Sequence, residues 1–176
     1  LFEQKIKSFV KSKYAIVCNS GTSALHLALL SIDIKKNDVI LMPAINFIAA
    51  YNMSISLGAK VFLVDVDPIT GQMTPEKLLK TIKQNKLNKI KAVITMYLGG
   101  SPENVYSFYK IKKKFKSILI EDACHAFGST YKMNRKDYKI GSCSHADIST
   151  FSFHPLKTIT TGEGGAVTTN RSQIAK

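Results

Sequence analysis

Short apolar runs alternate along the chain with longer stretches in which apolar residues recur at helical spacing. The runs are rich in β-branched residues and are mostly apolar on both faces, as strands inside a parallel sheet are. They predict strands over Ala15–Cys18, Asp38–Met42, Lys60–Val66, Ala92–Tyr97, Ser117–Glu121, Ile148–Phe153 and Ala166–Thr169. The stretches between them predict helices over Thr22–Ser31, Ile48–Leu57, Pro75–Gln84 and Asn104–Phe115.

This alternation predicts an α/β fold, a three-layer α/β/α sandwich in which helices cover both faces of a mostly parallel sheet. The rhythm changes after Phe153, where a loop and not a helix leads to the last strand, so we expect a hairpin-like or antiparallel edge there. Asp67–Gly71 has the composition of a turn, and Tyr131–Tyr138 is predicted to be an exposed loop.

The chain has 176 residues, which suits one domain, and 45% of them are hydrophobic, enough for a sizeable core. It begins at Leu1 and stops at Lys176 within helix-like patterns, so we expect a piece of a longer protein. No apolar run is long enough for a membrane span and no signal-peptide pattern is present. Three cysteines without paired spacing fit a reducing compartment, and we expect a cytoplasmic protein.

The formal net charge of +13 raises the possibility of a nucleic-acid-binding module. Only Arg135 and Arg171 are arginines, however, and the many lysines are spread along the chain. Arginine is the residue that suits bidentate contacts to bases and phosphates. We therefore favour solvated helix faces and loops, and keep nucleic-acid binding as the alternative from a different class of function.

Three segments carry candidate chemistry, and the first is the turn after the first strand. Ser20-Gly21-Thr22-Ser23 opens an apolar helix. Backbone N–H groups and the positive end of the helix dipole meet at such a junction and suit a phosphate. The segment matches neither the P-loop nor the dinucleotide-binding glycine pattern. It is equally compatible with a well-capped helix.

The second segment is an apolar strand that ends in acids, followed by His125. Asp122 lies at the strand end, where ligands of parallel α/β sheets bind. A carboxylate there suits a metal ligand, a general base, a partner for a cationic ring nitrogen, or only a solvated cap. A metal site built from His125, Cys143 and His145 has no supporting ligand spacing, and we expect no metal.

The third segment runs from Phe151 through Lys157 to Gly165, an aromatic strand that enters a hydroxyl- and glycine-rich loop. Burial or nearby positive charge makes a lysine nucleophilic, so Lys157 is a candidate to form an imine with an aldehyde cofactor. In a chain so rich in lysine, any single lysine is ordinarily a surface charge. The order of phosphate turn, strand-end Asp122 and loop lysine is therefore what points to chemistry.

Taken together, these segments resemble the sugar aminotransferases of the DegT/DnrJ/EryC1/StrS family, which are fold-type-I enzymes that use pyridoxal 5′-phosphate (PLP). The resemblance extends over essentially the whole chain. The matching segments are Ser20–Leu25, Pro43–Ala49, Val64–Asp67, Glu121–Ala126 and Phe151–Lys157. The stretch Phe151–Asn170 is most similar to the branch that aminates UDP-linked 4-keto-6-deoxy amino sugars on the way to pseudaminic acid.

The resemblance implies a role for each candidate residue. Lys157 would bind the cofactor aldehyde and then move a proton, and Asp122 would pair with the protonated pyridine nitrogen. Phe47 would stack on the ring, and His125 would contact its phenolic oxygen. The phosphate would be held by Gly21, Thr22, Ser23 and Ser152.

The resemblance also implies partners and missing parts. Residues 1–176 would be the PLP-binding large domain, truncated, without the C-terminal small domain of the family. Glutamate would be the amino donor and a nucleotide-linked keto-sugar the acceptor, with the active site shared across a homodimer. Lysine at position 157 favours transamination over the sugar dehydratases of the family, which carry histidine there.

Two features depart from the family pattern: Asn46, where threonine is common, and the long loop Lys132–Tyr138. By itself, the piece is expected to expose apolar surface and to aggregate or be weakly stable.

Overall fold

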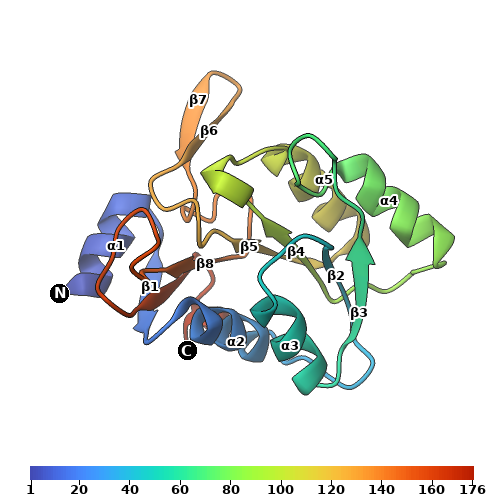
Figure 1. Ribbon diagram of the computed structural model, residues 1–176, viewed down its shortest axis with the longest axis horizontal. Coiled ribbons are helices and arrows are strands. Elements are labelled where there is room, and N and C mark those ends of the chain that lie inside the picture. Colours follow the sequence, from blue (N-terminus) through green and yellow to red (C-terminus); the bar gives the residue numbers. More distant parts are fainter.

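A seven-stranded sheet forms the centre of the protein, whose computed structural model describes residues 1–176 (Figure 1). The strand order is β1-β9-β8-β5-β4-β2-β3. The bounds are β1 Tyr14–Cys18, β2 Val39–Pro43, β3 Lys60–Val64, β4 Ala92–Met96, β5 Ile118–Asp122, β8 Ile148–Ser152 and β9 Gly165–Thr169. The predicted strands are thus confirmed, with ends that differ by one or two residues.

The pairing is mostly parallel, as predicted. Strands β3, β2, β4, β5 and β8 pair in parallel, whereas β9 is antiparallel to both β8 and β1. The expected antiparallel pairing of the last strand is confirmed, but its expected place at the edge is wrong. β1 pairs along the other side of β9, from Tyr14 opposite Thr169 to Cys18 opposite Gly165, and β1 is therefore the edge strand.

Helices cover both faces of the sheet. α2 (Gly21–Ser31), α3 (Ala49–Ser56) and the short α6 (Ser172–Ala175) lie on one face, and α4 (Pro75–Gln84) and α5 (Val105–Phe115) lie on the other (Figure 1). α1 (Phe2–Val10) packs with the loops that follow β4 and β5. The α/β/α sandwich expected from the sequence is confirmed.

The strands are apolar on both faces because each face meets a helix layer. In β2, Ile40 and Met42 pack toward α2 and α3, whereas Leu41 between them packs toward α4 and α5, and all three are buried. The helix starts follow local chemistry: the hydroxyl of Thr74 accepts the N–H of Lys77 at 3.3 Å, ahead of proline in the first turn of α4.

A β-hairpin stands where an exposed loop was expected, so the prediction for Tyr131–Tyr138 is wrong. β6 (Thr130–Met133) and β7 (Lys136–Lys139) pair antiparallel through the two-residue turn Asn134-Arg135. Both turn residues have positive φ, 48° and 62°, which suits a tight turn that matches the strand twist.

The hairpin is anchored by a cluster of tyrosines around buried His145. The Tyr131 hydroxyl lies 2.6 Å from Nδ1 of His145, and the ring of Tyr138 lies 5.0 Å from the imidazole. Tyr109 and Tyr106 of α5 contact the same imidazole, with ring centroids 5.1 Å and 6.0 Å away. The cluster therefore joins the hairpin to α5.

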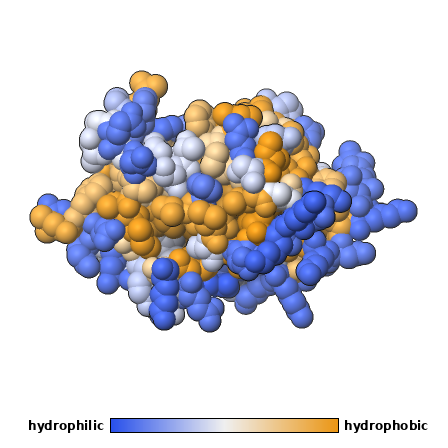
Figure 2. Space-filling model, turned by 90° about the horizontal axis from the view of Figure 1, so that it is seen from below, coloured by the Kyte–Doolittle hydropathy of each residue, from blue (hydrophilic) through white to orange (hydrophobic).

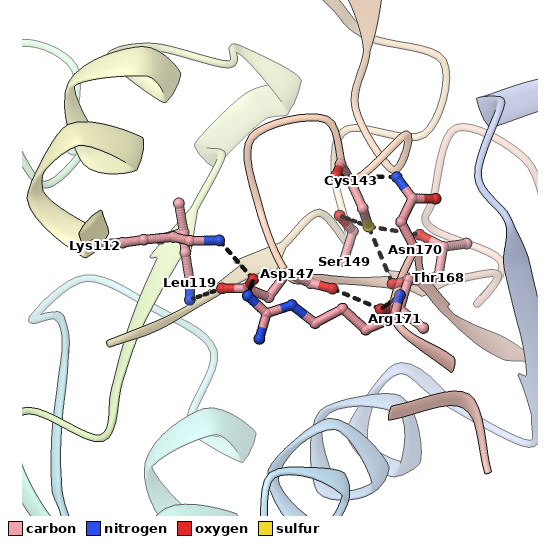
Figure 3. A network of polar contacts seen from close by, with 9 residues as sticks. Lys112, Leu119, Cys143, Asp147, Ser149, Thr168, Asn170 and Arg171 are labelled. Atoms are coloured by element: carbon pink, nitrogen blue, oxygen red, sulfur yellow. Dashed lines mark hydrogen bonds and ion pairs between the residues drawn. The ribbon is translucent and has the colours of Figure 1, made fainter. Parts of the chain in front are cut away.

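The amino-terminal end of β8 carries the most connected charge in the protein, the buried carboxylate of Asp147 (Figure 3). Lys112 of α5 and Arg171 both form ion pairs with it, and the N–H of Leu119 in β5 donates to it at 2.8 Å. The hydroxyl of Thr169 donates to the Asp147 carbonyl oxygen at 2.7 Å. One residue thus connects β5, β8, β9 and α5.

Removal of this carboxylate is expected to be costly. Asp147→Ala leaves the Lys112 ammonium, whose side chain is 12% exposed, without its partner, and we expect a loss of about 3–5 kcal/mol in the free energy of unfolding. Urea denaturation measures it. The matched control is Asp65→Ala, which removes the exposed ion pair with Lys77 and should change stability little. Equal effects of the two substitutions would contradict the structural role of Asp147.

Acid is expected to weaken the tyrosine cluster. Burial, and secondarily the charge of Lys112, lowers the pKa of His145, so the folded state resists a proton that the unfolded chain takes up below its pKa of about 6.5. The contribution of His145 to stability is therefore complete above that pH, and it is lost as the pH falls toward the pKa of the folded state. In thermal unfolding, His145→Phe should reduce this acid sensitivity. The part that comes from His125, whose pKa is also lowered by burial, should remain. An unchanged pH profile for His145→Phe would contradict the assignment.

Candidate active site

The candidate residues gather at one edge of the sheet because the strands that carry them run in the same direction. β1 and β8 both pair antiparallel to β9, so they are parallel to each other and to β5. Their carboxyl ends meet: a Cβ built on Gly21 would lie 2.8 Å from Cβ of Ser152 and 3.1 Å from Sγ of Cys124. The structure thus brings together the turn after β1 and the ends of β5 and β8.

The turn before α2 is both a capped helix start and an anion-compatible site. Ser20 Oγ accepts the N–H of Ser23 at 3.1 Å, and the Ser23 hydroxyl donates to Asn19 at 2.6 Å. The N–H groups of Gly21 and Thr22 precede any intrahelical acceptor and lie at the positive end of the helix. Because the Ser23 N–H is used in the cap, the groups left to hold an anion are the N–H groups of Gly21 and Thr22 and the nearby Ser152 hydroxyl.

Asp122 is a buried carboxyl group without an ion-pair partner. Its side chain ends β5, is 2% exposed, and accepts the N–H of Cys124 at 3.2 Å through Oδ1. Burial raises the pKa of Asp122, whereas hydrogen bonds from Cys124 and the charges of His125 and Lys157 lower it. Because a buried carboxylate is costly without a counter-charge, this position suits a cationic group.

Lys157 lies in the same neighbourhood as Asp122. It is half-buried in the turn after β8, where its N–H donates to the carbonyl oxygen of His154 at 2.9 Å. Its positive charge acts on the pKa of Asp122, Cys124 and His125, and it lowers that of His125 after the larger effect of burial. An amine, a carboxyl and an imidazole therefore share one electrostatic environment, as nucleophile, base and binding groups do in active sites.

Phe47 lies farther along the same edge, on the loop after β2, and its side chain is 64% exposed. Strand β4 lies between β2 and β5 in the sheet, so the loop that carries Phe47 follows a strand that is not adjacent to the strand ending in Asp122. Its neighbour Asn46 is unusual, because Oδ1 and Nδ2 are both buried without a hydrogen-bond partner. The loop borders a cavity of about 170 Å³ whose walls include Tyr51 and Leu63.

Cys124 was not among the residues selected from the sequence, yet it lies between Asp122 and the start of α2. It bonds to Asp122 and lies against Gly21. Its position two residues after a strand-end carboxylate was the available signal. The three residues considered for a metal site do not meet: Cys143 bonds to Thr168, His145 lies in the tyrosine cluster, and no group of three metal-ligating side chains forms.

Solved aminotransferases share this fold. The aminotransferase from Psychrobacter cryohalolentis matches with a TM-score of 0.88 at 35% identity, over 99% of this chain and 42% of that chain. The Helicobacter pylori aminotransferase involved in the biosynthesis of pseudoaminic acid matches with a TM-score of 0.85 at 33% identity, over 99% of this chain and 44% of that chain. The fold is therefore that of the PLP-dependent aminotransferases, as expected from the sequence.

Sequence comparison gives the family itself. The model of the DegT/DnrJ/EryC1/StrS aminotransferase family matches residues 1–176, and the chain belongs to this family. GDP-perosamine synthase of Caulobacter vibrioides is 36% identical over 99% of this chain and 44% of its own length. UDP-4-amino-4,6-dideoxy-N-acetyl-beta-L-altrosamine transaminase of Campylobacter jejuni is 39% identical over 98% of this chain and 44% of its own length. The chain thus spans less than half the length of these relatives. No helix is long and apolar enough to cross a membrane.

The close approach of β9 to the turn before α2 gives a test of the site's construction. A Cβ at position 165 would lie 2.2 Å from the Ser20 carbonyl oxygen and 2.9 Å from the Gly21 nitrogen, so Gly165→Ala must displace the first turn of α2. We expect a loss of about 1–3 kcal/mol in unfolding free energy. Gly162→Ala, where a Cβ meets nothing within 4 Å, is the control and carries only the strain of its positive φ. A smaller loss for Gly165→Ala than for this control would contradict the tight approach.

Proposed function

We propose that residues 1–176 form the cofactor-binding large domain of a PLP-dependent aminotransferase, with a small domain supplied by further sequence. The observation that carries the proposal is the buried, unpaired Asp122 beside the start of α2, with Lys157 in the same electrostatic environment. In a member of this family, these groups have the complementary chemistry for the separate parts of PLP.

The polar groups fit the charged ends of the cofactor. The unpaired carboxyl of Asp122 suits a protonated ring nitrogen, and its burial strengthens that ion pair. The free N–H groups of Gly21 and Thr22, with the Ser152 hydroxyl, suit the phosphate, and the missing side chain of Gly21 leaves room beside Ser152. Ser23 contributes by fixing this turn through Ser20.

The remaining groups fit the ring and the aldehyde. Phe47 has an exposed aromatic ring and would stack on the cofactor ring, and His125, whose pKa responds to the charges of Lys157 and Asp122, would contact the phenolic oxygen. When bound, PLP supplies an electron sink for the carbon next to the transferred nitrogen. Lys157 would hold the cofactor aldehyde covalently and then carry the proton, and Asp122 would keep the ring nitrogen protonated.

The names of the relatives suggest the substrate class. Both GDP-perosamine and the UDP-linked altrosamine are nucleotide-linked amino sugars. We propose that the full protein transfers nitrogen from glutamate to a nucleotide-linked keto-sugar, for cell-surface polysaccharide, flagellin glycan or related amino-sugar synthesis. The pseudaminic-acid branch is the finer proposal, supported by likeness to the Helicobacter pylori enzyme. Lys157 favours amination over the dehydratase reaction.

An apolar face supports a homodimer. A hydrophobic band crosses the side of the molecule seen from below, where α2 and α3 lie (Figure 2). Leu27 and Leu30 of α2 are 41% and 49% exposed, and Ile48 before α3 is 58% exposed. Exposed apolar surface of this kind marks an interaction site. We propose that a second subunit covers it.

Lys157 provides the first test. In the full-length protein, Lys157→Ala should abolish the visible absorbance of lysine-bound PLP, together with turnover, because Lys157 is the amine whose charge acts on Asp122, Cys124 and His125. Borohydride reduction of the unchanged protein should label Lys157, as peptide mass analysis would show. Thermal stability should be kept, since only the backbone of Lys157 is hydrogen-bonded. Substitution of exposed Lys132 to alanine is the control. Retained absorbance and turnover in Lys157→Ala would refute the assignment.

The reaction is tested separately with ¹⁵N-labelled glutamate and UDP-linked 4-keto-6-deoxy-N-acetyl sugar. We expect the label in the sugar product, as mass spectrometry would show. Loss of a hydroxyl from the sugar without nitrogen transfer would instead identify a dehydratase. Salt-sensitive nucleic-acid binding without a chromophore would favour the alternative class of function.

A further inference from the structure

We propose that His154 is a positioning residue that holds Lys157 where its amine can reach the cofactor aldehyde. The inference rests on the proposed function, because the aldehyde is what Lys157 would bind. It goes beyond that function in giving a role to an imidazole that lies three residues before the lysine and that no step of the proposed chemistry uses.

His154 and Lys157 are the two ends of a tight turn in the loop after β8. The N–H of Lys157 donates to the His154 carbonyl oxygen at 2.9 Å, and a bond between these positions closes a four-residue β-turn. Pro155 takes the second position of the turn, where its fixed φ is favourable. The direction in which the Lys157 side chain leaves the backbone is therefore set by this turn.

The His154 side chain closes the same turn a second time. Its Nδ1 accepts the N–H of Leu156 at 3.3 Å. Asn and Asp side chains form the equivalent bond, to the N–H two residues further on, when they stabilise turns. The imidazole thus acts as such a side chain does, and the N–H groups of Leu156 and Lys157 both bond to His154.

Burial does not hold this turn, because the Leu156 side chain is 87% exposed. Farther along the loop, the Thr160 hydroxyl donates to the Phe153 carbonyl oxygen at 2.9 Å, which tethers the loop beyond the turn. His154 supplies the side-chain bond that lies within the turn itself. Loss of the imidazole should therefore loosen the backbone that carries Lys157 while the rest of the loop stays attached to β8.

The backbone of His154 also joins this turn to a group proposed to hold the phosphate. Its N–H donates to Ser152 Oγ at 3.4 Å, and Ser152 lies beside Gly21 at the start of α2. Because Ser152 Oγ accepts this bond, its own hydrogen remains available to an anion. A substitution that changes only the His154 side chain keeps this backbone bond, so it should affect the amine and not the phosphate.

The experiment compares His154→Ala with His154→Asn in the full-length protein, because asparagine Oδ1 can accept a hydrogen bond in the place of Nδ1. Dissociation constants are measured by absorbance for PLP and for pyridoxamine 5′-phosphate, in which an amine replaces the aldehyde, so that no bond to Lys157 can form. We expect His154→Ala to bind PLP roughly two- to tenfold more weakly, the effect of one hydrogen bond, and the pyridoxamine form as the unchanged protein does. His154→Asn should restore most of the affinity for PLP.

The matched control is Leu156→Ala, which removes an exposed side chain but keeps the backbone N–H that His154 accepts. This variant should bind both cofactors as the unchanged protein does, and a loss of PLP affinity equal to that of His154→Ala would overturn the role of the imidazole. Unchanged PLP affinity in His154→Ala, equal weakening for both cofactors, or no recovery in His154→Asn would overturn it too. Absence of PLP binding by the unchanged protein would instead overturn the proposed function and the inference with it.

Discussion

The carboxylate of Asp147 fixes the register on which the rest of the sheet depends. It accepts the N–H of Leu119 in β5 and forms ion pairs with Lys112 and Arg171, so it locks β8 against β5 from the amino-terminal end. A slip of one residue would reverse every side chain of a strand that is packed on both faces. The same register places Asp122 opposite Thr150 at the other end. The geometry of the candidate site is thus set at the end of the sheet where no chemistry is proposed.

The buried acids of the sheet differ in how many partners the fold supplies to them. Asp147 has two cationic partners. Glu121 accepts hydrogen bonds from the hydroxyl groups of Tyr97 and Ser149, on the sheet face opposite that of Asp122. Asp122 has only the hydrogen bonds from its own turn. A buried charge is ordinarily satisfied within the fold. Asp122 therefore has the fewest partners of these buried acids, and we propose that a ligand supplies its counter-charge.

The local pattern of the sequence predicts the strands and helices well, because apolar runs and caps such as Thr74-Pro75 act over a few residues. The errors concern pairing between distant segments. Between its two tyrosines, the hairpin at Tyr131–Tyr138 is polar apart from Met133, so the segment has the composition of a polar loop. Its anchor His145 lies beyond it in the chain. The order of β1 and β9 likewise depends on contacts across the whole chain. Cys124 becomes visible as part of the site only when α2 is packed beside it.

The proposed site combines rigid and adaptable parts in a way that suits the reaction. The groups assigned to the phosphate and the ring nitrogen lie at a helix start and at the end of a central strand, both held by backbone pairing. Lys157 instead lies in an exposed loop, tied to β8 by bonds from Thr160 and Thr161 to the Phe153 carbonyl oxygen. Ring orientation requires fixed partners, whereas a group that first holds the cofactor and then moves a proton must change position. A long, flexible side chain on a tethered loop meets that second requirement.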